Sequence, residues 1–168
     1  MFSLFEEHTE LIQRGRRGKP IEFGHKVLFS ETKEKFITDY YVFEDSPSDT
    51  TLLPMVLVRH EDIFGEKVKN LAADMGFRPK EEKFEELSEL VEYLAVPKRL
   101  SDWGDSLLRL YQCFRAGIEG TISCLKRAYR LSRCHFHGFK GFCRMVGGAV
   151  FCHNLSVMAS LACGRKEE

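Results

Sequence analysis

The fold class of this chain follows from one segment, Val68-Lys69-Asn70-Leu71-Ala72-Ala73-Asp74-Met75-Gly76-Phe77. Its apolar part predicts a short strand over 68–73, and Asp74, followed closely by a glycine, marks the end of that strand. Apolar residues at helical spacing then predict a helix over 84–91, and 93–96 form a second short strand. A helix between two short strands is typical of a crossover connection, so we predict a mixed α/β fold.

Upstream of this segment, the sequence predicts a helix over 52–64 that stops at Gly65. Two runs rich in aromatic and β-branched residues, 23–29 and 36–43, predict strands joined by a short charged hairpin connection. Glycines and a proline within 15–20 indicate a loop. We expect the residues before that loop to enter the domain without forming a strand.

Downstream, residues 107–129 predict one helix with an apolar stripe, the first part of a long helical carboxyl-terminal region. A second face of this helix presents polar residues spaced three, four, four and three apart: Gln112, Arg115, Glu119, Ser123 and Lys126. Two interpretations of this face stay open. It is either an ion pair between side chains one turn apart, or a metal-binding carboxylate with adjacent bases that hold a phosphate backbone.

Length and composition exclude several classes of protein. The 168 residues are 43% hydrophobic and 30% charged, with 25 basic and 25 acidic residues, which is typical of one globular domain rather than a disordered, collagen-like or strongly basic chromatin protein. We find no run of about 18 apolar residues and no export signal, and therefore expect a cytoplasmic protein without a membrane partner. Six cysteines spaced 9 to 11 residues apart, with no C-x-x-C pair, indicate reduced thiols rather than a zinc site.

The neutral net charge hides a sorting of charges along the chain. Residues 109–144 contain eight bases and one acid, Glu119, whereas acids are plentiful over 31–105. A smaller basic cluster lies at Arg14, Arg16, Arg17 and Lys19. Such segments indicate either a polyanionic partner or a solvated helix face.

Asp74 and Glu119 are the candidate metal ligands. An acid at the carboxyl end of a strand in an α/β sheet lies where ligands gather, although an aspartate beside a glycine is also common in turns. Hard divalent cations such as Mg²⁺ bind carboxylate oxygens, water and substrate phosphates. A pair of such ions promotes phosphodiester transfer, for which these two residues would supply two acids.

Several motifs resemble DDE transposases of bacterial insertion sequences, in the group often labelled ISNCY. Phe114-Arg115-Ala116-Gly117-Ile118-Glu119-Gly120, with Lys126 seven residues after the glutamate, resembles the helix that carries the last acid. Gln112 stands where that family usually has a tyrosine, and Met75 replaces an arginine in the segment that resembles the second-acid strand. Four further stretches fit in the right order: His8–Gly15, Glu22–Val27, Val96–Arg99 and His153–Leu155.

The resemblance covers nearly the whole chain and implies an RNase H-like fold that performs DNA transposition. It implies that Asp74 is the second acid and Glu119 the third, both holding Mg²⁺ or Mn²⁺ for DNA cleavage and strand transfer. Transposon-end DNA is the implied partner, together with a homo-oligomer or a mixed oligomer with an intact transposase. The expected phosphate-binding residues are Arg115, Lys126, Arg127, Arg130 and Arg133.

The sequence departs from the family at the first acid, which the family carries on a central strand upstream of all these motifs. Asp49-Thr50-Thr51 has the right letters, but it follows the predicted hairpin and precedes Asp74 by too few residues. We therefore expect residues 1–168 to be one transposase catalytic domain lacking its amino-terminal part, with a basic helical part over 105–168 that carries the last acid. Such a fragment is expected to be inactive alone. The alternative is a non-catalytic DNA-binding regulator derived from a transposase.

Overall fold

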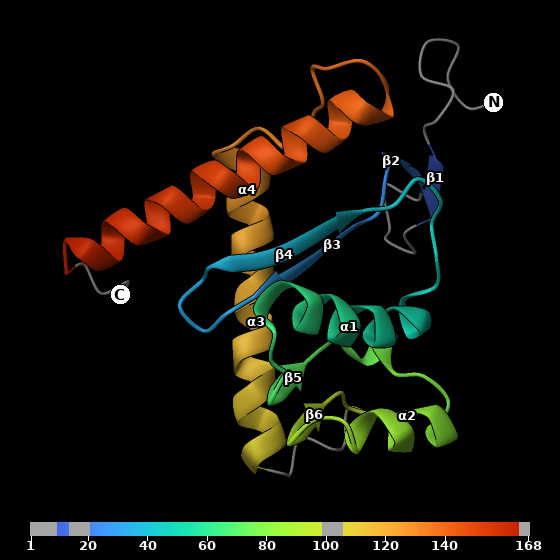
Figure 1. Ribbon diagram of the computed structural model, residues 1–168. Coiled ribbons are helices and arrows are strands. Elements are labelled where there is room, and N and C mark those ends of the chain that lie inside the picture. Colours follow the sequence, from blue (N-terminus) through green and yellow to red (C-terminus); the bar gives the residue numbers. More distant parts are fainter. Residues whose placement is uncertain (1–9, 14–20, 99–105, 165–168) are drawn as a thin grey trace. The chain divides into compact units, whose positions relative to one another are not determined.

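The computed structural model describes residues 10–13, 21–98 and 106–164 and has the predicted mixed α/β character (Figure 1). The basic cluster over 14–20 lies outside the described residues. The chain divides into two compact units. We call Pro47–Thr121 the central unit, and Met1–Ser46 together with Ile122–Glu168 the flanking unit.

The central unit contains the crossover predicted from the sequence. Its elements are η1 (Asp49–Thr51), α1 (Leu52–Phe64), β5 (Asn70–Ala72), η2 (Met75–Phe77), α2 (Glu81–Ser88), β6 (Tyr93–Ala95) and the first part of α3 (Ser106–Arg127). β5 and β6 pair in parallel, with Leu71 opposite Leu94, and α2 connects them. Both strands are shorter than predicted, because a strand ends where its ladder of hydrogen bonds ends, not where its apolar residues do.

The apolar residues of the central unit meet in one cluster. Leu53 of α1, Leu87 of α2 and Val96 after β6 are buried together. α1 ends at Gly65, as predicted, in the left-handed conformation (φ 71°), which glycine adopts without steric cost. The core therefore holds both helices against the short parallel pair.

The flanking unit contains the predicted hairpin and one pairing that the sequence did not predict. β3 (Val27–Glu31) and β4 (Ile37–Val42) are antiparallel. The strand expected over 23–29 is instead divided, since β2 (Ile21–Gly24) pairs with β1 (Glu10–Gln13). The expectation of no strand before the loop was therefore wrong. Four residues are too few to show the alternation that identifies a strand.

α4 (Gly138–Ala162) packs along β4 and closes the core of the flanking unit (Figure 1). Asn154 of α4 binds both backbone groups of Ile37: its Oδ1 accepts from the amide at 3.0 Å, and its Nδ2 donates to the carbonyl at 2.9 Å. The buried His153 bonds through Nε2 to the Lys35 carbonyl at 2.9 Å. A Cβ added at Gly147 would lie 2.7 Å from the Tyr40 hydroxyl, so the helix approaches the hairpin closely.

α4 also has the length and composition of a membrane-spanning helix, with a mean hydropathy of 1.4, although the sequence was expected to contain no such segment. Core helices of globular proteins pass the same test, and Val146, Ala149 and Val150 of α4 are buried. This single helix is therefore weak evidence for a membrane.

The described strands form three separate two-stranded sheets: β1–β2, β3–β4 and β5–β6. An RNase H-like core would unite its strands in one sheet. Within the described ranges the structure therefore establishes the α/β class without that larger sheet.

Candidate functional site

Asp74 lies directly beyond the carboxyl end of β5, as the sequence predicted. Its Oδ1 accepts a hydrogen bond from the Met75 amide at 2.8 Å, so the side chain caps the short η2 turn. The side chain is nevertheless 61% exposed, and its Oδ2 lies 3.6 Å from Nη1 of Arg115. One oxygen therefore fixes the residue while the rest of the carboxylate is available to solvent.

Gln112 positions α3 against the carboxyl ends of both parallel strands. Its side-chain Nε2 donates to the Ala73 carbonyl at 3.2 Å and to the Ala95 carbonyl at 2.9 Å, and the residue is buried. An amide nitrogen has two hydrogens, so it can serve both carbonyls at once. The sequence placed Gln112 on the polar face of the helix and noted it as a departure from a family tyrosine, but did not predict these two hydrogen bonds. Its place at the start of the polar face of the helix was the available signal.

Arg115 brings the two candidate acids together. Its Nη1 lies 3.3 Å from Oε1 of Glu119, one turn further along α3, and 3.6 Å from Oδ2 of Asp74. The separation of the two carboxylate oxygens therefore cannot exceed the sum of these distances. The ion pair within the helix, one of the two interpretations left open by the sequence, is present. The arginine also contacts an acid 41 residues earlier in the chain.

The exposures of these three side chains differ in a way that matters for binding. Arg115 is 19% exposed, whereas Asp74 and Glu119 are 61% and 70% exposed. Water and small ions can reach both carboxylates, while the guanidinium is largely enclosed. No group of three or more His, Cys, Asp or Glu side chains within the described ranges could hold a metal ion. Two carboxylates are the acidic ligands that this cluster offers, a donor set that Mg²⁺ completes with water and phosphate oxygens.

Asp49 lies closer to this cluster than the sequence suggested. It begins η1, and a Cβ added at Gly76 would be 4.0 Å from Asp49 Oδ2. Asp49 thus neighbours the turn that Asp74 caps, although 25 residues separate the two in sequence. α1 and β5 occupy the interval between η1 and η2, and the two short turns contact each other.

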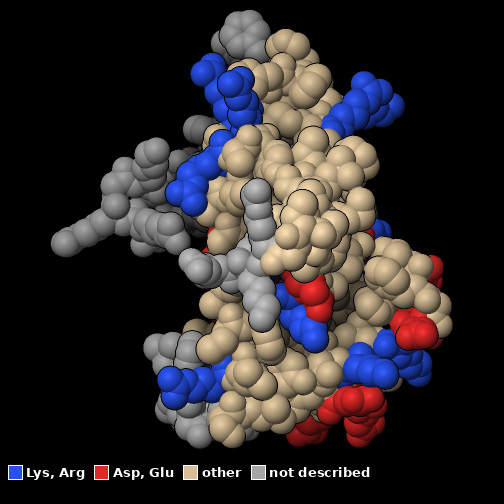
Figure 2. Space-filling model, turned by 90° about the vertical axis from the view of Figure 1, so that its left-hand side faces the viewer, with Lys and Arg blue, Asp and Glu red and all other residues tan. Residues whose placement is uncertain are grey.

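The predicted phosphate-binding residues beyond Arg115 belong to the end of α3 and the turn after it. Lys126, Arg127, Arg130 and Arg133 are all exposed. Arg130 adopts a left-handed conformation (φ 57°) and so marks the turn that ends the helical run. On the face in Figure 2, basic side chains lie at several places, some of them beside acidic ones. The four basic residues named above are accessible to solvent and do not belong to a core.

Comparison with protein-family models, curated proteins and solved structures finds no match. The resemblance to transposases accordingly stays a prediction.

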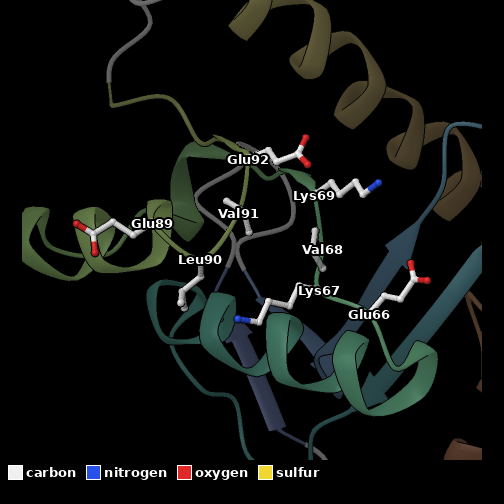
Figure 3. Close-up of a pocket in the computed structure, with 8 residues that line it drawn as sticks. All are labelled: Glu66, Lys67, Val68, Lys69, Glu89, Leu90, Val91 and Glu92. Carbon is white, nitrogen blue, oxygen red and sulfur yellow. The ribbon is translucent and has the colours of Figure 1, made fainter.

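A surface hollow of about 590 Å³ lies away from these residues. It is lined by the segments Glu66–Lys69 and Glu89–Glu92, which precede β5 and β6 (Figure 3). The Lys69 carbonyl accepts from the Glu92 amide at 2.8 Å, which ties the two segments together. The hollow is at the amino ends of the parallel strands, whereas ligands of α/β sheets gather at the carboxyl ends. We therefore place the candidate site at Asp74 and Glu119.

The histidines and cysteines have ordinary structural environments. His153 is buried and bonded to a backbone carbonyl, which gives it a structural role that the sequence left undecided. All six cysteines are free, and none is fully buried: Cys113, Cys152 and Cys163 are exposed and the other three are partly buried. Burial, reinforced by the nearby Glu44, raises the pKa of the Cys143 thiol and keeps it protonated.

Proposed function

We propose that the chain carries part of the catalytic region of a DDE transposase with RNase H-like ancestry, and that Asp74 and Glu119 are its second and third acids. The observation that carries the proposal is the convergence of both acids on Arg115. An acid that follows a parallel strand and an acid on a later helix, 45 residues apart in sequence, share one guanidinium nitrogen. The β5–α2–β6 crossover supports the same assignment, because it places the first of these acids at the carboxyl edge of a sheet.

Asp74 and Glu119 would hold Mg²⁺ or Mn²⁺. Their exposed carboxylates are hard oxygen ligands, and such ions are commonly held by one or two carboxylates with water and phosphate completing the shell. Ions held by these residues in a complete site would supply activation of the attacking oxygen and charge stabilisation at the leaving 3′ oxygen of DNA. Gln112 contributes by fixing the register of α3, so that Glu119 stays opposite Asp74.

DNA is the proposed partner of the basic side chains. Four basic side chains that follow Glu119 are exposed, and no acidic residue occurs in the sequence among them: Lys126, Arg127, Arg130 and Arg133. Contacts to phosphates would position the duplex without reading its sequence. Because these motifs supply two acids where the family uses three, we expect the 168 residues by themselves to bind DNA and metal but not to cleave DNA.

Two binding measurements on the same protein test the proposal. Mn²⁺ binding followed by electron paramagnetic resonance is expected to be saturable and to be lost in both Asp74→Asn and Glu119→Gln. Duplex DNA binding followed by fluorescence anisotropy is expected to weaken with salt and in Arg127→Gln. Mn²⁺ binding that neither acid affects would refute the assignment of the site.

A second function, that of a DNA-binding regulator without catalysis, is favoured by the pairing of Arg115 with both acids. Arg115 offsets part of the negative charge of Asp74 and Glu119, which reduces their repulsion of DNA phosphates. The exposed bases beyond Glu119 can then interact with DNA. Such a regulator would bind DNA equally well with Mn²⁺ or with EDTA, and Asp74→Asn would leave its affinity unchanged or higher. A metal-loaded site would instead make DNA binding stronger in Mn²⁺, and Asp74→Asn would abolish that gain. Mixed assembly with an intact transposase would be the route of its action.

A further inference from the structure

We propose that Arg115 is a resident counter-cation of the acidic pair, which a divalent ion must displace in order to bind. The inference rests on the proposed function, since it concerns the same two carboxylates. It assigns to Arg115 a charge-balancing role: before metal arrives, the guanidinium lies close to both acids and offsets part of their charge, and the divalent ion takes over that role.

The geometry of the contacts indicates a cation that can be exchanged. One nitrogen, Nη1, serves both acids, at 3.3 Å from Glu119 and 3.6 Å from Asp74. Strong charge-assisted hydrogen bonds between arginine and carboxylates are shorter, about 2.7–2.9 Å, and are frequently bidentate. Arg115 therefore offsets half of the pair's charge by proximity without locking either carboxylate.

The charges of the cluster give the direction of the effect. Two carboxylates and one guanidinium carry a net charge of −1, and the same carboxylates without Arg115 carry −2. Removal of the guanidinium therefore increases the attraction for a divalent cation, and it also removes a competitor for the same oxygens. Because the carboxylates are well exposed, solvent screens this interaction, so the effect is moderate rather than large.

The helix that carries Arg115 does not depend on this arginine for its position. Gln112, nearly one turn earlier, already binds α3 to the backbone of both strands. Glu119 is therefore expected to remain opposite Asp74 when the arginine is replaced. A change in metal affinity would then report the loss of the charge and not a displacement of the helix.

Arg115 also has a feature that a simple structural ion pair does not need. Its Nε is buried and has no hydrogen-bond partner within the described part of the chain. An unpaired buried donor opposes this placement of the side chain, and that cost is relieved when the guanidinium moves. The resting position is thus one from which Arg115 can be released.

The test is an Mn²⁺ titration of the full chain, followed by electron paramagnetic resonance, for the original protein and two variants, Arg115→Gln and Arg115→Met. We expect the Kd for Mn²⁺ to fall about two- to fivefold in both variants, because one cation is removed from beside two solvent-exposed carboxylates. Arg115→Lys, which keeps the charge, is expected to stay close to the original value. The matched control is Arg109→Gln, which removes the same charge from an exposed position on the same helix and should change the Kd less than twofold.

The outcomes separate the inference from the proposed function. If the original protein binds Mn²⁺ through Asp74 and Glu119 but both Arg115 variants bind equally or more weakly, the inference is overturned and the proposed function stands. Equal tightening in Arg109→Gln would also overturn it, because the effect would then be one of overall charge. If no variant binds Mn²⁺ in a manner that depends on the two acids, both proposals are refuted. Arg115→Met keeps the test decisive if the glutamine variant fails to fold.

Discussion

Replacement of Gln112 by leucine is expected to loosen the central unit at the point where its two strands meet α3. The leucine has nearly the volume of glutamine but no hydrogen-bond donor. Two side-chain hydrogen bonds, at 3.2 Å to Ala73 and 2.9 Å to Ala95, would be lost in a buried environment. The strands themselves are three residues long and form only a two-stranded parallel pair, which has little stability of its own.

The size of the effect follows from these contacts. Each hydrogen bond contributes about 0.5–1.5 kcal/mol net, and a buried acceptor left without a partner costs about 1–3 kcal/mol. The carbonyl of Ala95 keeps one bond, from the Ala73 amide at 3.2 Å, so the Ala73 carbonyl is the one that suffers most. We therefore expect the free energy of unfolding to fall by about 2–3 kcal/mol in Gln112→Leu.

Urea unfolding followed by circular dichroism measures this change. With a slope typical of small domains, the midpoint is expected to fall by about 1–2 M at unchanged slope. Arg109→Gln is the control, because it changes an exposed residue of the same helix and should leave the midpoint unchanged. A Gln112→Leu protein as stable as the original would refute the assignment of Gln112 as the residue that joins α3 to the strands.

Three further predictions follow from other contacts. Gly148→Ala is expected to raise the free energy of unfolding by up to about 1 kcal/mol, because the added Cβ would meet no other atom. Gly147→Ala should lose that gain, because its Cβ would collide with the Tyr40 hydroxyl. Thermal unfolding of the two variants measures the difference. Cys143, whose raised pKa keeps it protonated, should react with iodoacetamide at neutral pH more slowly than the exposed Cys152, as mass spectrometry of partly labelled protein can measure. Hydrogen bonds from Lys98 and Arg78 lower the pKa of Glu81. The contribution of the Glu81 carboxylate to stability is therefore present above the ordinary pKa of glutamate and is lost as the pH falls through the lowered pKa. The midpoint temperature of Glu81→Gln should therefore fall less between pH 6 and pH 3 than that of the original.

The local elements could be predicted from the sequence because their signals are local. The spacing of apolar residues identified α1 and α3, and Gly65 correctly marked the end of α1. The β5–α2–β6 crossover was likewise predictable, because short apolar runs bracket an amphipathic helix. β1 was missed because its four residues carry no periodic signal, and it is a strand only through its pairing with β2.

The candidate site was predictable in part. Helical spacing identified the pair of Arg115 and Glu119, and the end of an apolar run identified Asp74. Nothing in the spacing could show that Arg115 contacts Asp74, because that contact depends on how α3 packs against the strands. The role of Gln112 was hidden for the same reason, since its two acceptors are backbone atoms that carry no sequence signature.

The double hydrogen bond between Asn154 and Ile37 has a consequence for the solubility of the hairpin. An open strand edge presents unpaired amides and carbonyls that recruit strands from other molecules and so promote aggregation. The Asn154 side-chain amide makes the same two hydrogen bonds that a residue of a neighbouring strand would make. It accepts from the Ile37 amide and donates to the Ile37 carbonyl. A helix side chain thus protects β4 at this point, and the protection is lost with a single substitution that leaves every strand residue in place.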